Sequence, residues 1–475
     1  MSLTEDFLFI ENKYKLNSIK IDGFTPWVYM RFGLWDSVMN PLRKLEKTKL
    51  EKIRFSIKSA FSILRILLMV RKNRVPKRVD ICFLSHPRRV LIDNTYECIY
   101  TDALAEEFPD SVTLERLYNN FYRLSPVKTQ NTLYLDKIEI RGYIHGAIAK
   151  YFRSSRFNYI KKQMKTLFSD ALTELSVRTG IEFNSDKFAA QASLKYCFYK
   201  AKYKKYEKLL RKISPRLIIE TCYYSTNVMA VNEIAKKIGI PTVELQHGII
   251  HDDHIAYSFA QGERIPQFAD KMFLFGEYWK SKAAYPLEDN DLMSVGFPYL
   301  EQQKMKYEKN KSGKVLLFIS QPVISAHCEY DRLAADISAR MCQKGWSVVF
   351  KLHPGEYGDW ERRFPLLVDS NVKVISDNYP LYALFSEATA VVGLNSTALF
   401  EAVSYNLPIF IYDIFGAERM DDLCEAGYAV KFKDADELCN VLENLNDQDI
   451  QVKLEIWKSN ALQNMAAEIQ RFLEK

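Results

Sequence analysis

Two short stretches decide the fold of this chain: VVFKLHP at residues 348–354 and VVGLNST at residues 391–397. Each begins with a continuous apolar run, which is typical of a strand buried on both faces of a parallel sheet. Each ends in small or polar residues and leads into a segment with helical character. Ligands of parallel sheets bind just beyond the carboxyl ends of the strands. We therefore expect His353, Ser396 and Thr397 to face one crevice, where helix N-termini favour a phosphate group.

The length and composition of the chain indicate two α/β domains. The chain has 475 residues, 48% of them hydrophobic, which is more than one core of ordinary size accommodates. Apolar, strand-like runs alternate with helical stretches, as in parallel sheets covered by helices. The strand-like runs are residues 79–84, 217–220, 242–245, 272–275 and 292–295, followed by 315–319, 348–351, 372–375, 390–393 and 409–412.

We therefore predict an α/β fold with two Rossmann-like domains that face each other across a cleft. The first domain is expected over residues 76–300 and the second over residues 314–448. Residues 301–313 are polar and without apolar periodicity, which predicts an interdomain linker. A basic helical segment over residues 1–75 precedes the first domain, and a C-terminal helix is expected over residues 449–475.

The positive charge is concentrated near the N-terminus. Thirteen Lys and Arg against two Glu lie between Arg43 and Arg78, a balance of +11, so the rest of the chain carries about −4 of the total of +7. This distribution argues against a protein that binds nucleic acid. The apolar run from Arg54 to Val70 is too short and too charged to span a bilayer, but it suits a basic amphipathic helix in contact with an anionic membrane. A helix packed on its own domain with a solvated basic face is an equal alternative.

The N-terminus and the cysteines indicate the compartment. Glu5, Asp6 and Glu11 lie in the first twelve residues, which lack the basic region and apolar core of a secretory signal. The 8 cysteines are scattered without C-x-x-C pairs or metal-like spacing, so we expect reduced thiols. Together with the basic segment, this predicts a cytoplasmic protein that is peripheral at the inner face of the cell membrane.

His353 is the first candidate for nucleotide binding. Pro354 and Gly355 turn the chain directly after it, which leaves the imidazole at the edge of the sheet. There the ring could donate a hydrogen bond to a nucleotide phosphate, or neutralise it when protonated. A purely structural role in the loop is the alternative.

The second strand end offers Asn395, Ser396 and Thr397, which precede a helical run that begins at Ala398. An ordinary N-cap explains these residues, yet a cap serves one or two amides and leaves others for a phosphate. Glu401 lies about one turn into this helix, where its carboxylate could accept hydrogen bonds from ribose hydroxyls. A solvated helix glutamate is the alternative.

In the first domain, the strand at residues 242–245 delivers Gln246, His247 and Gly248. The glycine allows close approach of a ligand at the strand end. His247 would lie on the crevice side, where a general base that takes the proton of a hydroxyl nucleophile belongs. We predict that His247 is the catalytic residue.

Two more polar clusters are candidates for acceptor binding. In HDDH at residues 251–254, the two histidines would meet only on a helix, and no Glu or Cys completes a zinc set. We therefore expect no metal, and a polar loop in which His251 touches the acceptor. His86, Arg88 and Arg89 follow the first strand, where the arginines could contact an anionic acceptor. A solvated basic turn is the alternative.

These residues resemble the two-domain GT-B glycosyltransferases of bacterial surface polysaccharide synthesis. ISQP at residues 319–322 and KLHP at residues 351–354 are similar to the paired Gln-Pro and His-Pro motifs of capsule transferases that use CMP-linked Kdo or sialic acid. In those families the His-Pro histidine and a Ser/Thr pair hold the cytidine nucleotide. The resemblance implies that role for Gln321, His353 and Pro354, together with the serine and threonine of the second strand end.

QHG at residues 246–248 and LNST at residues 394–397 are also similar to the CDP-glycerol glycerophosphotransferases of teichoic acid synthesis. The histidine of their Trp-His-Gly motif is the proposed base, which corresponds to His247. Gln246 replaces the tryptophan here, and the Asp that commonly precedes the paired serines is absent. The departure favours a sugar as the transferred group.

The sequence thus predicts an inverting, metal-independent glycosyltransferase that needs no cofactor. Its donor would be a nucleotide-sugar, with cytidine favoured, and its acceptor a cell-surface polysaccharide or lipid-linked glycan of the capsule or lipopolysaccharide kind. The alternatives are a CDP-glycerol-type polyol phosphate transferase, a nucleotide-sugar 2-epimerase and a non-catalytic subunit of a polysaccharide assembly complex.

Overall fold

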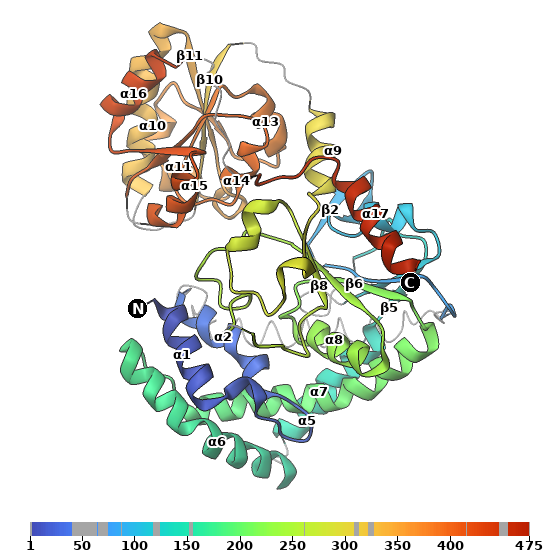
Figure 1. Ribbon diagram of the computed structural model, residues 1–475. Helices are drawn as coiled ribbons and strands as arrows, with labels where there is room; N and C mark the ends of the chain where they lie inside the picture. The colour runs from blue at the N-terminus through green and yellow to red at the C-terminus, as the bar shows by residue number, and fades with distance from the viewer. Residues whose placement is uncertain are drawn as a thin grey trace. The chain divides into compact units, whose positions relative to one another are not determined.

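The protein is described here by a computed structural model, which divides the chain into two compact units (Figure 1). Unit 1 comprises residues 1–275, 279–296 and 460–475, and unit 2 comprises residues 276–278 and 297–459. The described residues are 2–39, 64, 75–86, 88–116, 124–151, 155–260, 262–307, 313–321, 327–414, 416–445 and 455–474.

Unit 1 is built on a seven-stranded parallel sheet in the order β5-β4-β1-β6-β7-β8-β9. From β1 the chain moves outward on one side through β4 and β5, and then returns to add β6 to β9 on the other side. The strand order therefore reverses between β1 and β6, which is where doubly wound sheets bind their ligands. The strands are β1 (Ile81–Leu84), β4 (Ser111–Glu115), β5 (Thr132–Tyr134), β6 (Leu217–Thr221), β7 (Thr242–Leu245), β8 (Lys271–Leu274) and β9 (Leu292–Ser294).

Helices cover this sheet, and a short antiparallel hairpin, β2 (Arg89–Ile92) with β3 (Thr95–Cys98), follows β1. The long helices α5 and α6 both pack on α7, and α7 also packs on α8 (Figure 1). Helix α8 ends at Gly239, whose φ of 74° is the left-handed conformation that closes helices. The helices are α1 (Leu3–Tyr14), α2 (Pro26–Met39), α4 (Asp102–Glu107), α5 (Asp136–Tyr151), α6 (Ser155–Thr179), α7 (Ser185–Ile213), α8 (Thr226–Ile238) and α17 (Ala461–Leu473).

The N-terminal helices α1 and α2 are part of unit 1. Helix α1 packs on α6 and α2 packs on α7, and Phe7, Trp27 and Arg31 are buried between them. The predicted basic segment thus contains a packed helical part, residues 2–39. Its basic amphipathic stretch lies outside the described residues, Leu64 excepted.

Unit 2 carries a six-stranded parallel sheet in the order β12-β11-β10-β13-β14-β15. In chain order this is the 3-2-1-4-5-6 arrangement of the Rossmann fold, with its reversal between β10 and β13. The strands are β10 (Lys314–Ile319), β11 (Trp346–Lys351), β12 (Lys373–Ile375), β13 (Ala390–Gly393), β14 (Ile409–Tyr412) and β15 (Ala429–Phe432).

The core of unit 2 lies between this sheet and its helices, with Phe318, Phe350 and Val392 among its fully buried side chains. Helix α10 packs on both α12 and α16. The helices are α9 (Pro298–Lys306), α10 (His327–Met341), α11 (Trp360–Arg363), α12 (Pro365–Val368), α13 (Leu381–Glu387), α14 (Ala398–Val403), α15 (Asp421–Glu425) and α16 (Ala435–Glu443).

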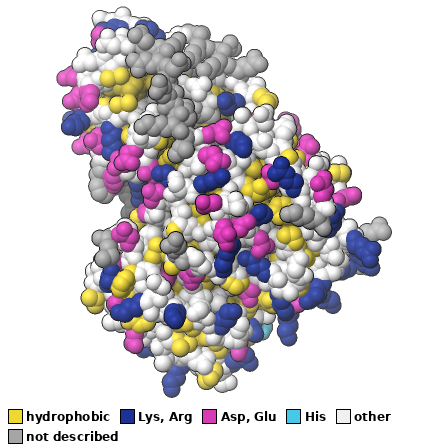
Figure 2. Space-filling view, viewed as in Figure 1, with side chains coloured by type: hydrophobic (Ala, Val, Ile, Leu, Met, Phe, Trp, Pro, Cys, Tyr) yellow, Lys and Arg dark blue, Asp and Glu magenta, His cyan; other side chains and the backbone are white. Residues whose placement is uncertain are grey.

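The two parallel, doubly wound sheets confirm the predicted α/β class with two Rossmann-like domains. The expected linker at residues 301–313 begins inside α9, so its first part is helical. The chain ends in α17, which packs on α4 in unit 1. Among the helices in the described ranges, none has the length and apolar character needed to cross a bilayer. On the face drawn in Figure 2, acidic and basic side chains are interspersed.

Candidate functional site

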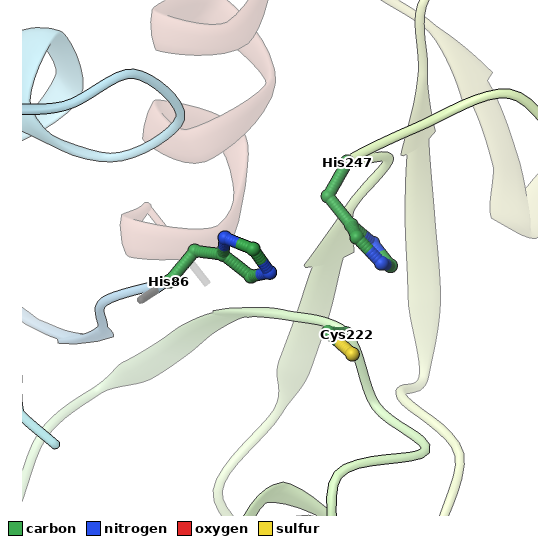
Figure 3. Close-up of side chains that lie close together, drawn as sticks. All are labelled: His86, Cys222 and His247. Carbon is green, nitrogen blue, oxygen red and sulfur yellow. The ribbon is translucent and has the colours of Figure 1, made fainter. Parts of the chain in front are cut away.

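Three side chains with catalytic potential meet at the carboxyl edge of the unit 1 sheet. His86 follows β1, Cys222 follows β6 and His247 follows β7, and these strands are neighbours in the sheet. The imidazole rings of His86 and His247 have centroids 5.4 Å apart and an interplanar angle of 35°. Figure 3 shows the two rings turned toward each other, with Cys222 beside the gap. This trio lies at the reversal of strand order, so the structure places predicted His86 and predicted His247 in one site.

His247 is held on all sides by aromatic hydroxyl groups. Its Nε2 lies 3.1 Å from the Tyr224 hydroxyl, and its Nδ1 lies 3.4 Å from the Tyr257 hydroxyl. Its backbone carbonyl accepts a 2.6 Å hydrogen bond from Tyr100. The Oε1 atom of Glu244 is 3.8 Å from Nδ1, and the His247 side chain is 12% exposed. The ring is therefore fixed in place, with only a small part of it open to a substrate.

Both imidazoles are uncharged at neutral pH. Burial, followed by the nearby His86 and His254 rings, holds the pKa of His247 well below its usual value. Burial, followed by the charges of Arg116 and Arg88, lowers the pKa of His86 to about 3. A neutral imidazole has one lone pair and one N–H, so each ring offers one acceptor and one donor to a bound molecule.

Two carboxyl groups lie beneath the site. Glu220 on β6 and Glu244 on β7 are directly paired in the sheet register, and both are fully buried. Burial raises the pKa of Glu244 to about 8, and burial together with Glu244 raises the pKa of Glu220. One oxygen of each, Oε2, has no hydrogen-bond partner among the residues that the structure describes. Neighbouring buried carboxyls cannot both ionise cheaply, so this pair holds at least one proton near neutrality.

The arginines of the β1 turn have different surroundings. Arg88 is exposed, and its guanidinium donates to the Tyr100 hydroxyl at 3.2 Å. The Arg89 side chain is fully buried and forms ion pairs with Asp102 and Glu115. The prediction that Arg89 contacts an anionic acceptor is therefore wrong, because its charge is already neutralised inside unit 1.

Arg116 joins this site although its position in the sequence gives no indication of it. It follows β4, the neighbour of β1, and donates to the Ser85 carbonyl at 3.1 Å and to the Ser225 hydroxyl at 3.0 Å. Its remaining buried nitrogen, Nη2, has no hydrogen-bond partner among the described residues. Arg116 thus brings a positive charge close to His86 and His247.

The trio offers three donor atoms that could in principle hold a metal ion. One donor atom each from His86, Cys222 and His247 lies within 4.8 Å of the others, a spacing that a metal could draw together. However, His86 Nδ1 accepts the backbone N–H of Arg88 at 2.9 Å, so the ring proton is on Nε2, the nitrogen turned toward His247. A metal there would need the lone pair of Nε2. We therefore assign no metal to this trio.

The loop after β7 is held by the N-terminal helices. Arg31 of α2 donates to the carbonyls of Ile255 at 2.6 Å and Ser258 at 2.8 Å, and it forms a buried ion pair with Glu11. His254 stacks on the rings of Phe32 and Trp35, at 5.8 and 6.0 Å between centroids.

His251 lies in this loop. Its backbone carbonyl accepts a hydrogen bond from the His254 N–H at 2.8 Å. Burial, followed by the nearby His251 side chain, lowers the pKa of His254 to about 4. The acceptor role of His251 stays a prediction.

In unit 2, the predicted nucleotide-binding residues gather at one edge of the sheet. Gln321 follows β10, His353 follows β11 and Asn395 follows β13, and β10 lies between the other two strands. The two stretches that decided the fold therefore lie close to the reversal of strand order. Nucleotide binding by these residues stays a prediction.

His353 has a structural role that leaves one nitrogen available. Its Nδ1 accepts the backbone N–H of Gly355 at 3.1 Å, and its own N–H donates to Glu356 Oε2 at 2.8 Å. Pro354 begins the short 3-10 helix that His353 caps. The ring itself is exposed. The contacts in the turn use Nδ1 and the backbone N–H, so the structural role is compatible with the predicted binding role of Nε2.

At the end of β13, Ser396 is buried and its hydroxyl accepts the N–H of Ala398 at 3.3 Å, while Thr397 is exposed at the start of α14. Asn395 donates to the Gly416 carbonyl at 3.3 Å, and its buried Oδ1 has no partner in the described part of the chain. Within the same residues, the buried hydroxyl of Ser320, at the end of β10, has none either.

Glu401 is half-buried, and it receives a hydrogen bond from Tyr382. The expectation of a carboxylate free for ribose must therefore be revised: Glu401 already has a protein partner. Its contact with ribose stays a prediction.

Sequence reasoning missed Glu244, Tyr257, Tyr224, Cys222 and Arg116. One signal was present. A glutamate inside the apolar runs LIIET at residues 217–221 and TVEL at residues 242–245 is unusual, because a buried carboxyl is retained only where it has partners or a function. The sequence around Tyr224, Tyr257 and Arg116 contains no comparable signal.

No family model matches the chain, and no curated protein matches it significantly. Its fold is similar to solved structures at low identity. One is the UDP-GlcNAc 2-epimerase of Methanocaldococcus jannaschii, at TM-score 0.49 and 12% identity, covering 83% of this chain and 99% of that one. Another is the Neisseria meningitidis UDP-GlcNAc 2-epimerase, at TM-score 0.47, 12% identity, 84% and 100%. A third is the wall teichoic acid polymerase TagF, at TM-score 0.43, 11% identity, 90% and 99%. At this level of similarity, their substrates and reactions are theirs alone.

Proposed function

We propose that the protein is an inverting, metal-independent glycosyltransferase. It moves a sugar from a nucleotide donor, with cytidine favoured, to a cell-surface polysaccharide or lipid-linked glycan. Unit 2 binds the donor and unit 1 supplies the base. The observation that carries the proposal is that each unit gathers its polar side chains at the carboxyl edge of its sheet, around the reversal of strand order.

The chemistry of unit 2 supports binding of a nucleotide. The hydrogen of His353 Nε2 is a donor for a phosphate oxygen, because Nδ1 is already occupied by the Gly355 amide. The unpartnered atoms Ser320 Oγ and Asn395 Oδ1 on the neighbouring strand ends add polar groups for the rest of the nucleotide.

The chemistry of unit 1 supports removal of a proton. His247 is neutral, so its lone pair is available to a hydroxyl nucleophile. Arg88 and Arg116 place positive charge beside it, which suits an acceptor that carries phosphate or carboxylate groups. The exposed guanidinium of Arg88 is the group that such an acceptor would meet first.

The first test is binding of nucleotides to the whole protein. A thermal-shift panel of CMP, CDP, UDP and GDP identifies the donor class, because a ligand of the folded state raises the melting temperature. The best nucleotide is then titrated calorimetrically into the wild type, His353→Gln and the surface control His145→Gln. Weaker binding to His353→Gln alone supports the proposal, and equal binding to all three contradicts it.

The second test is product analysis with the corresponding nucleotide-sugar. Hydrolysis or transfer of the sugar that stops in His247→Gln supports a transferase. Conversion of the donor to an epimer in the absence of any acceptor would instead establish a 2-epimerase. Absence of any turnover, together with nucleotide binding, would favour the non-catalytic subunit.

A further inference from the structure

We propose that Tyr257 and Glu244 are positioning residues that fix the tautomer of His247, with the proton on Nδ1 and the lone pair on Nε2. The inference rests on the proposed function for the use of that lone pair as a base. The tautomer itself follows from the direction of each hydrogen bond around Glu244, Tyr257 and His247.

Glu244 determines the direction of the first bond. Its Oε1 accepts the backbone N–H of Tyr223 at 3.2 Å and lies 2.7 Å from the Tyr257 hydroxyl. A backbone amide can only donate, so Oε1 is an acceptor. If Glu244 holds a proton, that proton belongs on Oε2, the oxygen without a partner on the carboxyl paired with Glu220. In either charge state, Tyr257 donates its single hydrogen to Oε1.

The direction of the second bond follows from the first. With its hydrogen on Glu244, the Tyr257 oxygen can only accept from His247 Nδ1, which lies 3.4 Å away. Nδ1 therefore carries the ring proton of the neutral imidazole, and Nε2 carries the lone pair. The Tyr224 hydroxyl, 3.1 Å from Nε2, then donates to that lone pair. A substrate hydroxyl that replaces Tyr224 would find an acceptor waiting for its proton.

The hydrogen-bonded chain Glu244–Tyr257–His247, which we call the relay, also explains how a buried imidazole can become charged during the reaction. The O–H bond of the acceptor breaks and the Nε2–H bond forms, while the acceptor oxygen bonds to the anomeric carbon and the nucleotide leaves with the electrons of the donor C–O bond. The resulting imidazolium keeps its Nδ1–H directed at Tyr257, with the Glu244 carboxyl 3.8 Å away. Tyr257 and Glu244 are 2% and 0% exposed, so water does not replace either partner.

Two other histidines of the protein serve as references for the tautomer of His247. His86 Nδ1 accepts the Arg88 amide and His353 Nδ1 accepts the Gly355 amide, so both rings carry their proton on Nε2. His247 is expected to be the opposite tautomer in the same molecule.

Imidazole ¹⁵N NMR of the full-length protein tests the tautomer directly, because a protonated ring nitrogen and one with a lone pair resonate far apart. The seven histidines are assigned by single His→Gln variants. We expect His247 to be protonated at Nδ1, and His86 and His353 at Nε2. A wild-type His247 protonated mainly at Nε2 would overturn the inference.

Variants separate positioning from structure. Tyr257→Phe removes the hydrogen-bond acceptor of Nδ1–H. The roughly tenfold excess of the Nδ1–H tautomer of His247 over the Nε2–H tautomer should then be lost. Tyr285→Phe is the matched control: its ring is 6.0 Å from Tyr257, but its hydroxyl donates to the Trp279 carbonyl at 2.7 Å. Glu244→Gln should keep the tautomer, because an amide oxygen still accepts both bonds. An unchanged His247 spectrum in Tyr257→Phe contradicts the relay.

The NMR outcome is independent of the proposed function. The predicted spectra in a protein that fails every transferase assay would support the relay and refute the reaction. A working transferase whose His247 is protonated at Nε2 would support the reaction and refute the relay.

Discussion

The two His-Pro turns of the molecule, at His86 in unit 1 and His353 in unit 2, share a local structure but not an environment. Each histidine follows a parallel strand, and each Nδ1 accepts the backbone N–H two residues on, at 2.9 and 3.1 Å. His86 is half-buried against the rings of Tyr100 and His247, and its pKa falls to about 3, chiefly because of burial. His353 is exposed. The same turn therefore gives the same tautomer, while the neighbours decide whether the ring meets other side chains or solvent.

From this contrast we expect His86 and His353 to have different roles, and experiments can test the difference. His86 lies in a network of aromatic and charged groups that depends on unit 1 being intact. His353 depends mainly on its own turn, where Glu356 and Gly355 hold it.

The largest expected effect comes from loosening unit 1 alone. Glu11→Gln leaves Arg31 buried without its ionic partner, because the Glu11 and Arg31 side chains are only 1% and 2% exposed. The free energy of unfolding should therefore fall by about 3–5 kcal/mol. Arg31 holds the loop that carries Tyr257. Hydrogen exchange should therefore rise across residues 246–259 and stay unchanged across residues 346–357.

The control for that change is Glu174→Gln, which removes an exposed ion pair between α6 and Lys13 of α1. Exposed pairs contribute at most about 1 kcal/mol, so hydrogen exchange in the loop should not change. Equal responses of the two variants would show that Arg31 does not hold the loop.

His247→Gln is expected to have the next largest effect. Removal of a general base lowers turnover by about a hundredfold or more. Because the change lies in unit 1, the calorimetric affinity for the best nucleotide should stay within about twofold. A loss of nucleotide affinity equal to the loss of turnover would contradict the assignment of the base to unit 1 and of the nucleotide to unit 2.

His353→Gln should have the reverse profile. A hydrogen bond to a charged phosphate contributes about 1.5–3 kcal/mol, which corresponds to a loss of roughly tenfold to a hundredfold in nucleotide affinity. His86→Gln, the corresponding change in the other turn, should leave that affinity unchanged. Titration calorimetry on both variants decides the point, and equal losses would refute the assignment of the nucleotide to unit 2.

The last expected effect is on stability against acid. A histidine whose pKa is lowered to about 3 in the folded state favours the neutral form, so its contribution is present above the unfolded value of 6.5 and is lost as the pH falls below it. Arg116, Arg88 and Arg89 face His86 and add to this loss. The slope is at most about 1.4 kcal/mol per pH unit.

Melting temperatures between pH 7 and pH 4 test this effect. His86→Gln should flatten the acid side of the curve, whereas His353→Gln should follow the wild type because its ring is exposed. A wild-type curve that stays level down to pH 4 would show that burial of His86 does not lower the stability of the protein in acid.

Most of the fold could be predicted from the sequence. The ten apolar runs chosen as strands all overlap strands of the two parallel sheets, because a run buried on both faces is apolar over most of its length. Among the described strands, β4, β5 and β15 of these sheets and the hairpin strands β2 and β3 were missed. In β4, SVTLE at residues 111–115 is fully buried although it contains Ser111, Thr113 and Glu115, and only its tertiary partners make this possible. Glu115, for example, receives Arg89.

The candidate site was predictable only in part. The sequence shows which strands end in histidine, so His86, His247 and His353 could be placed at sheet edges. It does not show burial, and for that reason Arg89 was assigned to the acceptor although it lies in an internal ion pair. Glu244 was seen only as part of an apolar strand.

By itself, the sequence determined the two Rossmann-like sheets and the positions of the His-Pro turns, because hydrophobic continuity and local turn chemistry depend on residues near in the chain. The tertiary structure alone decided that β1, β6 and β7 are neighbours, and hence that His86, Cys222 and His247 meet. It also decided that burial lowers the pKa of His86 and His247. Both properties depend on strand order and on the exclusion of water, which arise only when segments far apart in the chain pack together.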